Sequence, residues 1–372
     1  MPDAAWSTIF MLLVLGCNVC SVRLYGESEY YFSLIKVLMV LVFIIVWAIG
    51  FKYWSDPGAF ANGGVGTVSV LLSAGYSFQG TEVVGITAGE ASNPVKAVPR
   101  AIKNTFWRIL VFYVLTILLI GMCIPYDNQD MANSDGSPST SPFTLVFKLA
   151  GVDAGVHVVN AIVLVSVLSA CNSSIYVTAR ILLGLAHDGN APRSFTKTNR
   201  FGAPWVAVLV SSTFGFACCF VSIYSASVAF TWFVNITAIT GYISWLFISV
   251  VHLRFRRAYV KQGRNVDDLP YKSALYPLPA LFSAILCLLI ILGQGYTAFT
   301  PSFDGVKFVG NYIGLLPFLI CYIGHKLVRR KPWVAIEEID FETGRVTHVD
   351  IERARASKKA TPWYKRFLYL LT

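Results

Sequence analysis

The stretch that decides the fold reads Ser73-Ala-Gly-Tyr-Ser-Phe-Gln-Gly-Thr-Glu82 and lies inside an apolar run over residues 66–89. Glycines, a glutamine and a carboxylate are poor material for a continuous helix that faces lipid. Backbone unwinds at membrane depth only where protein or a water-filled cavity satisfies its polar groups. Secondary transporters build substrate sites at such breaks. Two interpretations remain open: a broken helix that forms a site, and a kinked helix whose glycines admit close neighbours.

The chain around this stretch is too apolar for a soluble domain. Of its 372 residues, 55% are hydrophobic and 13% are charged, against about 25% charged in soluble proteins. Apolar runs near the required length of about 20 residues predict an all-α polytopic membrane protein with about nine transmembrane helices. The spans are expected at residues 6–24, 32–53, 66–89, 104–124, 154–184, 205–223, 228–252, 276–299 and 309–328. We therefore expect a transmembrane domain over residues 1–328 and a polar tail over residues 329–372.

The basic residues give this topology its direction. The net charge is +10, and 26 of the 30 Lys and Arg residues fall on one side of the expected spans. Such an excess marks the cytoplasmic side, which places the tail in the cytoplasm and the acidic loop 126–143 outside. The charge therefore needs no nucleic-acid partner, and the lipid bilayer is the expected surrounding.

Two charged side chains fall inside expected spans. Glu82 sits near the middle of the 66–89 run, where a carboxylate is costly and is usually functional. It suits proton transfer, and the alternative is a structural carboxylate bonded to neighbouring helices. Lys36 lies about one turn into the 32–53 run, and its alternative is a lysine that reaches the cytoplasmic surface with its ammonium.

Polar residues also gather in two later spans. The 154–184 run contains Ser166, Ser169 and Asn172-Ser-Ser174, and the 228–252 run contains Asn235. These side chains could join helices by hydrogen bonds or line a cavity.

The chain shows no enzyme or metal signature. HExxH, GxSxG and P-loop motifs are absent, the five histidines are scattered, and the eight cysteines lie in or beside apolar runs. We therefore predict no enzymatic activity, no metal site and no cofactor.

The residues at the break resemble a family signature. The segment Phe78-Gln-Gly-Thr-Glu-Val-Val-Gly-Ile-Thr-Ala-Gly-Glu-Ala-Ser-Asn-Pro94, followed by Val98-Pro-Arg-Ala-Ile102 and Phe106-Trp-Arg-Ile109, resembles fungal amino-acid permeases. These belong to the amino acid–polyamine–organocation superfamily. Similar blocks follow in family order: Tyr25-Gly-Glu27, Ile35-Lys-Val37, Leu168-Ser-Ala-Cys-Asn-Ser-Ser174, Ala179-Arg180, His252-Leu-Arg-Phe-Arg256, Gln262-Gly263, Leu269-Pro-Tyr271 and Gln294-Gly-Tyr-Thr-Ala-Phe299.

The resemblance implies an inverted-repeat transporter fold of twelve spans. The nine spans expected here correspond to the family's fourth to twelfth, so the resemblance implies an N-terminally incomplete chain. The first family span, with its Gly-rich break, and the third, which also lines the site, have no counterpart. An inactive fragment is therefore one alternative.

The resemblance also assigns roles to residues. Tyr76 corresponds to an aromatic gate, and backbone carbonyls near Tyr76 and Gln79 to acceptors of the substrate ammonium. Glu82 and Lys36 correspond to residues of proton coupling, with Lys36 placed where sodium sits in sodium-coupled relatives. The expected substrate-binding residues are Tyr76, Phe78, Gln79, Gly80, Thr81, Glu82, Asn172, Ser173, Ser174 and Asn235.

The function implied is proton symport of amino acids across the plasma membrane. The stretches Trp232-Phe-Val-Asn-Ile-Thr-Ala-Ile-Thr-Gly241, Trp245-Leu-Phe-Ile-Ser249 and Phe299-Thr-Pro-Ser-Phe-Asp-Gly-Val306 resemble the basic branch, which carries arginine and lysine. A broad-specificity permease and a permease-like sensor that binds without transporting are the alternatives. The family also implies trafficking or ubiquitin machinery as partners of the tail.

Overall fold

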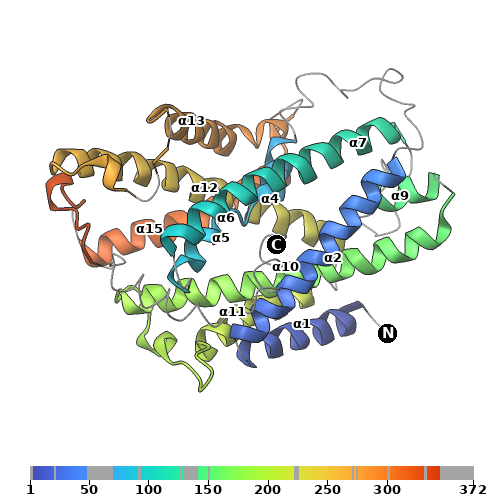
Figure 1. Cartoon of the computed structure of the whole chain (residues 1–372), viewed down its shortest axis with the longest axis horizontal. Helices are drawn as coiled ribbons and strands as arrows, with labels where there is room; N and C mark the ends of the chain where they lie inside the picture. The colour runs from blue at the N-terminus through green and yellow to red at the C-terminus, as the bar shows by residue number, and fades with distance from the viewer. Residues whose placement is uncertain are drawn as a thin grey trace. The chain divides into compact units, whose positions relative to one another are not determined.

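The computed structural model describes most of the chain as helices. The described residues are 3–20, 22–47, 70–90, 94–125, 127–128, 141–149, 151–221, 226–269, 272–273, 275–299, 302–330 and 333–343. The main helices within them are α1 (Asp3–Cys20), α2 (Val22–Trp47), α4 (Leu71–Phe78), α5 (Val83–Ile86), α6 (Pro94–Arg108), α7 (Leu115–Cys123), α9 (Pro142–Leu149), α10 (Asp153–His187), α11 (Trp205–Val221), α12 (Ala226–Lys261), α13 (Leu278–Gly293), α14 (Gly305–Tyr312) and α15 (Leu315–Arg329). No strand occurs among these residues, which confirms the all-α class (Figure 1).

One π-helical segment and several short 3₁₀ helices complete the described elements. A π-helical segment, η2 (Ile109–Val114), joins α6 to α7, and η1 (Thr87–Glu90) follows α5. Further 3₁₀ turns are η4 (Arg193–Thr196), η5 (Val266–Asp268), η6 (Tyr296–Ala298) and η7 (Ile336–Glu338).

Each of the nine expected spans coincides, in its described part, with a helix or an interrupted run of helices. Three of the described helices are long and apolar enough to cross a membrane: Ala97–Cys123, Ala154–His187 and Phe230–Lys261. The pair Gly305–Tyr312 and Leu315–Val328, bent by 52°, makes a fourth if it is one span. Three shorter apolar helices cover Ala5–Val19, Trp205–Phe220 and Leu278–Gly293. The polytopic membrane class is thus confirmed, and the inverted repeat stays an expectation.

The helix boundaries correct several expected bounds. α2 begins at Val22 rather than at 32, and α12 continues to Lys261 rather than ending at 252. Both extensions carry charged residues. Charge does not end a helix, because its hydrogen bonds join backbone groups and do not require apolar side chains. The end of the expected outer loop 126–143 begins a helix, α9, whose Thr144-to-Phe147 turn is buried.

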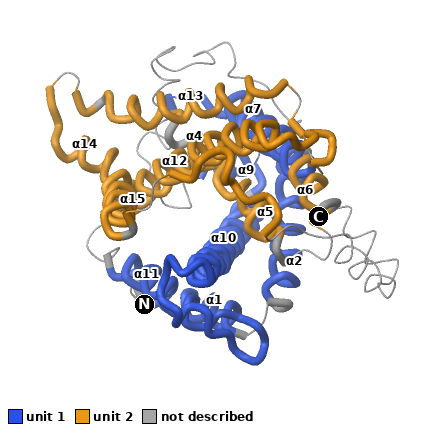
Figure 2. Tube along the Cα trace, turned by 90° about the vertical axis from the view of Figure 1, so that its left-hand side faces the viewer, with its two compact units in different colours: residues 1–61, 104–229, 360–372 blue, residues 62–103, 230–359 orange. Residues whose placement is uncertain are grey.

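The chain divides into two compact units, coloured separately in Figure 2. Unit 1 comprises residues 1–61, 104–229 and 360–372, and unit 2 comprises residues 62–103 and 230–359. The expected division at residue 328 stays a prediction. α15 ends at Arg329, and the tail beyond residue 343 lies outside the described residues.

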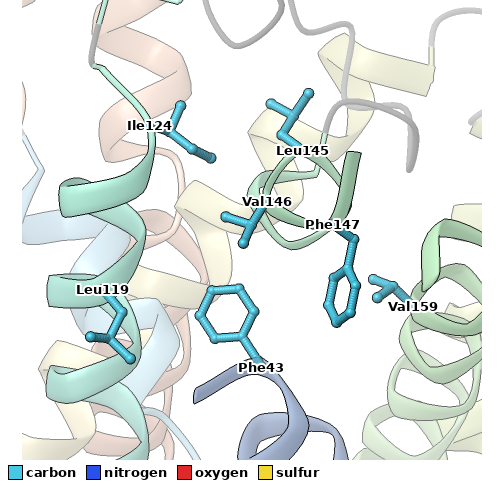
Figure 3. Packing of buried hydrophobic residues seen from close by; sticks show 7 residues of the cluster. All are labelled: Phe43, Leu119, Ile124, Leu145, Val146, Phe147 and Val159. Carbon is cyan, nitrogen blue, oxygen red and sulfur yellow. The ribbon is translucent and has the colours of Figure 1, made fainter. Parts of the chain in front are cut away.

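Unit 1 is built around the long helix α10, against which α1, α2, α9 and α11 pack. One of its cores joins α2, α7, α9 and α10 through Phe43, Leu119, Val146, Phe147 and Val159 (Figure 3). Phe43 is fully buried, and its ring meets Phe143 edge-on at 5.0 Å. A second core, where α1 and α11 meet α10, contains Met11, Val14, Ile175, Ala179, Ala207 and Val208.

Unit 2 packs α12 against α13 and the α14–α15 bend. Its core contains Ile239, Tyr242, Ile243, Cys287, Ile290 and Ile291. The bend approaches α12 closely, because a Cβ at Gly314 would lie 2.1 Å from the Ile239 side chain. α12 therefore packs closely against the α14–α15 bend within this unit.

One face of α13 is apolar yet uncovered. Leu278, Phe282, Ile285, Leu289 and Leu292 recur at helical spacing, and each is more than half exposed. Soluble proteins rarely leave so continuous an apolar stripe in water. Lipid is the surrounding that this face requires.

Candidate functional site

The predicted break is present in unit 2. α4 ends at Phe78, where the chain turns extended at Gln79 (φ −64°, ψ 151°), and α5 begins only at Val83. Gly80 has φ +96°, a left-handed value that favours glycine. A helical turn is thus lost over residues 79–82, and the interpretation of residues 73–82 as a broken helix is confirmed.

Gln79 fastens the break to α12. Its Nε2 donates hydrogen bonds to the backbone oxygens of Thr237 at 2.9 Å and Ala238 at 3.1 Å. Gly241 makes room for this side chain, since a Cβ there would lie 1.8 Å from Nε2 of Gln79. The glutamine of the family signature therefore holds the interrupted segment in place.

Glu82 lies at the end of the break and is half-buried. Its carboxylate accepts hydrogen bonds from the Gly80 N–H at 3.2 Å and from the Trp245 indole Nε1 at 3.1 Å. The Thr81 hydroxyl adds a contact at 3.5 Å. The unwound backbone and an aromatic residue of α12 thus hold one carboxylate at the end of the break.

A second aromatic residue supports this arrangement. The Tyr242 hydroxyl donates to the Leu71 carbonyl at 2.6 Å, and the Tyr242 ring meets Trp245 edge-on at 5.5 Å. Gly75 admits the tyrosine, because a Cβ there would lie 2.0 Å from its hydroxyl. The start of α4 is therefore anchored to α12 one turn from the residue that holds Glu82.

The other expected residues of this unit lie around the break. The Tyr76 side chain is 41% exposed, and its carbonyl accepts the Gln79 N–H at 3.2 Å. Phe78 is half-buried at the end of α4. Asn235 donates instead to Asn311 of α14 at 3.2 Å.

Lys36 and the α10 residues belong to unit 1. The Lys36 ammonium donates to Ser169 at 2.8 Å, and Ser169 donates to Glu29 of α2 at 2.6 Å. Asn172 is buried and donates to the second oxygen of Glu29 at 3.0 Å. Lys36 is thus hydrogen-bonded to α10. The sequence had left open a second possibility, in which its ammonium reaches the cytoplasmic surface.

The three expected residues on α10, Asn172, Ser173 and Ser174, each make a different contact. Asn172 enters the buried network, whereas the Ser173 hydroxyl accepts from Tyr25 at 3.3 Å. Ser174 is exposed, and its hydroxyl donates to the Ala170 carbonyl of its own helix at 2.8 Å. Joining helices, one of the two alternatives for these residues, therefore describes Asn172 and Ser173.

Sequence reasoning missed Glu29, Asn18 and Trp245 as site residues. Glu29 precedes Lys36 by seven residues, which places both on one face of a helix. That spacing could have revealed it, but the span was expected to start at 32. Asn18 and Trp245 gave no such signal, because their partners are distant in sequence.

No metal-binding cluster of His, Cys, Asp or Glu occurs in the described part of the chain. The expectation of no metal and no cofactor stays a prediction.

Comparison with known proteins agrees with this geometry. The family model described as amino acid permease matches residues 1–336. The chain belongs to the amino-acid permease family. The break at Gln79–Glu82 is therefore a feature of a permease, and the resemblance seen in the sequence is confirmed.

Permeases named for basic amino acids are among the similar proteins. The chain is 43% identical to the lysine-specific permease of Escherichia coli, over 91% of this chain and 73% of that protein. It is 40% identical to the basic amino-acid permease of Saccharomyces cerevisiae, over 93% of this chain and 64% of that protein. It is 37% identical to the lysine-specific permease of the same yeast, over 93% of this chain and 60% of that protein. The chain thus spans between 60% and 73% of the length of these three relatives.

Proposed function

We propose that this chain acts in the symport of amino acids with protons across the plasma membrane, and that its substrates are cationic. The observation that carries the proposal is the helix break at residues 79–82, with Glu82 held beside it by Trp245. Family membership supports the amino-acid class, and the named relatives support lysine or arginine. The tail is assigned to the cytoplasm by the excess of basic residues on that side.

The break offers groups of the polarity that an amino acid requires. The last carbonyls of a helix such as α4 lack intrahelical partners and carry partial negative charge. They suit a substrate ammonium near Tyr76 and Gln79. Glu82 adds a full negative charge in the same segment, which suits either a proton or the cationic side chain of the substrate.

The membrane potential favours such a substrate strongly. A cationic amino acid that enters with one proton moves two positive charges inward. Each charge gains about 2.3 kcal/mol per 100 mV, so two gain roughly 4.6 kcal/mol. A neutral amino acid with one proton gains half of that.

The test is uptake of labelled arginine and lysine by permease-deficient cells that express the chain, at several external pH values, with and without sodium. We expect saturable, sodium-independent accumulation that rises as the outside is acidified. An unlabelled amino-acid panel then tests specificity. If leucine or glutamate displaces labelled arginine as well as lysine does, the broad-specificity alternative replaces the cationic one. Binding without any flux would replace transport by a sensor role, and neither binding nor flux would leave an inactive fragment.

A further inference from the structure

A single buried hydroxyl joins two opposite charges in unit 1. Ser169, which is 1% exposed, accepts a hydrogen bond from the Lys36 ammonium at 2.8 Å and donates one to Glu29 Oε2 at 2.6 Å. Glu29 and Lys36 stand two turns apart on one face of α2, and Ser169 reaches them from α10. A hydroxyl placed in this way can pass a proton on, because it accepts and donates at once.

The second oxygen of Glu29 is held as firmly. Asn172 Nδ2 donates to Glu29 Oε1 at 3.0 Å, and Asn18 Nδ2 donates to Asn172 Oδ1 at 2.7 Å. Asn18 and Asn172 are 4% and 3% exposed. Asn18 Nδ2 also donates to the Val14 carbonyl at 3.1 Å, which fixes the orientation of its amide. Helices α1, α2 and α10 thus meet in one chain of hydrogen bonds that ends on Glu29.

Other titratable groups lie on α2 and on the elements packed against it. On the elements packed against α2, they are Asp3, Cys17 and Cys20 on α1, Cys123 on α7, Lys148 on α9, and Asp153, His157, Cys171, Tyr176, Arg180 and His187 on α10; α2 itself adds Arg23, Tyr25, Glu27, Tyr30 and Tyr31. Lys148 and His157 are exposed. Cys171 contacts Met11, and Arg180 lies over the Tyr176 ring. Glu29 is the carboxylate whose charge acts on Lys36.

We propose that Glu29 and Lys36 form one proton-binding centre, with Ser169 as the relay between them. In the relay step an N–H bond of Lys36 breaks as its proton passes to Ser169 Oγ. The Ser169 O–H bond breaks as its own proton passes to Glu29 Oε2. The ammonium and the carboxylate at the two ends of this relay become a neutral amine and a carboxylic acid. A further proton on the amine gives the loaded form, with an ammonium, a carboxylic acid and a net charge of +1.

This inference rests on the proposed proton symport. It adds Glu29 to the two residues, Glu82 and Lys36, already expected to take part in proton coupling. Isolated charges are costly at membrane depth, whereas a neutral pair is not. The centre therefore carries an uncompensated charge only in its loaded form, and it can bind that proton while both side chains stay hydrogen-bonded to Ser169.

The first test needs no transport. The purified chain is placed in lipid nanodiscs, and its infrared spectrum is recorded as the pH is lowered. We expect a carboxylic-acid C=O stretch that Glu29→Gln removes and that Glu29→Asp keeps. Glu27→Gln is the matched control, because it removes the same charge from an exposed position of the same helix. A Glu29→Gln spectrum identical to that of the unaltered chain would overturn the inference.

Lys36 and Ser169 are tested in the same experiment. Lys36→Met should change the pH at which the carboxylic-acid band forms, because the ammonium at the other end of the relay is gone. Ser169→Ala should change the pH at which the band forms. Size-exclusion profiles of all variants exclude misfolding, and Glu29→Asp serves as the conservative variant. If the band follows pH identically in Lys36→Met and in the unaltered chain, the two groups do not share a proton.

The second test uses uptake. Glu29→Gln should lower pH-driven accumulation by about tenfold or more, the scale of one lost charge-assisted hydrogen bond. Glu27→Gln should stay within about twofold. Full accumulation by Glu29→Gln overturns the inference and leaves the proposed symport standing. If the unaltered chain accumulates nothing, the symport proposal fails, and the infrared test still decides whether the centre binds a proton.

Discussion

At the scale of residues, the break depends on glycines whose missing side chains leave room for a neighbouring side chain. Gly241 of α12 leaves the space that the Gln79 side chain fills, and Gly75 leaves the space of Tyr242. In both places a glycine on one helix faces a hydrogen-bonding side chain of the other. The pairing explains how the eight-residue helix α4 and the break that follows it are kept against α12.

Gly241→Ala should displace Gln79 and destabilise the break. The added methyl would lie 1.8 Å from Nε2, so the side chain must leave its two carbonyl acceptors. We expect a loss of about 1–3 kcal/mol in the free energy of unfolding and a loss of substrate uptake. Thermal unfolding in detergent and labelled uptake measure the two effects.

Gly184→Ala is the matched control for this substitution. A Cβ at Gly184 of α10 meets nothing within 4 Å, and alanine favours a helix interior. Its stability should be unchanged or slightly raised. Equal behaviour of the two variants would show that Gly241 does not position Gln79.

The residues also show how far the sequence predicts the site. Gly80 and Glu82 made the break predictable, because glycine and a carboxylate are both unfavourable in a helix that faces lipid. Their partner Trp245 was noticed only as part of a family block, since no local rule joins positions 163 residues apart. Glu29 was excluded by a boundary based on hydropathy, although its helix continues through it.

At the scale of elements, the described start of the tail, residues 333–343, packs on the end of α12. Gln262 Nε2 donates to the carbonyls of Ile336, Glu337 and Ile339 at 2.9–3.3 Å. The Phe341 ring meets Phe255 and Tyr259 edge-on, each at 5.2 Å. Gly263, with φ +74°, ends α12 so that Gln262 and Arg264 both face this segment.

Gln262→Ala should release segment 333–343. The three backbone carbonyls share the two N–H donors of the Gln262 amide, so about two hydrogen bonds of 0.5–1.5 kcal/mol each would be lost. A glutamate-specific protease should then cut at Glu337 or Glu338 at least about fivefold faster. Arg257→Ala, an exposed change on the same helix, is the control. Equal cleavage rates in both variants would mean that Gln262 does not hold the segment.

Acid should loosen the same segment. The hydrogen bond from Lys261 lowers the pKa of Glu337 below its usual 4.5, and the Thr343 hydroxyl lowers the pKa of Asp340 below 3.8. A carboxyl with a depressed pKa stabilises the folded form above its unfolded pKa and loses that effect as the pH falls through the folded pKa. Protection from hydrogen exchange over residues 333–343, measured against the intrinsic exchange rate of an unfolded peptide at the same pH, should therefore be high at neutral pH and lower below about pH 4.

Because both carboxyls are on the surface, the acid effect should be small. Lys261→Met should remove the part that comes from Glu337. A protection factor that does not change with pH in the unaltered chain would contradict the assignment.

Element boundaries were predictable where hydropathy and helix bounds coincide, as in α10 and α11. They were not predictable where a helix continues past the end of its apolar run, as α12 does beyond residue 252 with Arg254 and Lys261. The buried helix α9 was missed because the polar residues before it suggested a loop throughout. Its burial comes from contacts with α10 and α2, which the local sequence does not encode.

At the scale of the whole molecule, the side of the membrane on which the tail lies can be tested directly. A glutamate-specific protease added to inside-out vesicles should cut within residues 333–343, and the same protease added to right-side-out vesicles should not. The reason is the basic excess of the tail and of the loop that follows α12. Detergent-opened vesicles of both kinds are the control. Cleavage from the outside alone would reverse the topology.

The short apolar helices have a consequence for where such a protein can reside. α1, α11 and α13 contain 18, 17 and 16 residues. At 1.5 Å per residue they are about 24–27 Å long, less than the roughly 30 Å of a typical hydrocarbon core. Acyl chains that cover the exposed stripe of α13 meet a helix shorter than the core, and thinning of the bilayer beside it costs a fraction of a kcal/mol per Å of mismatch. We therefore expect the protein to concentrate in thinner patches of membrane and to avoid patches thickened by sterol and sphingolipid.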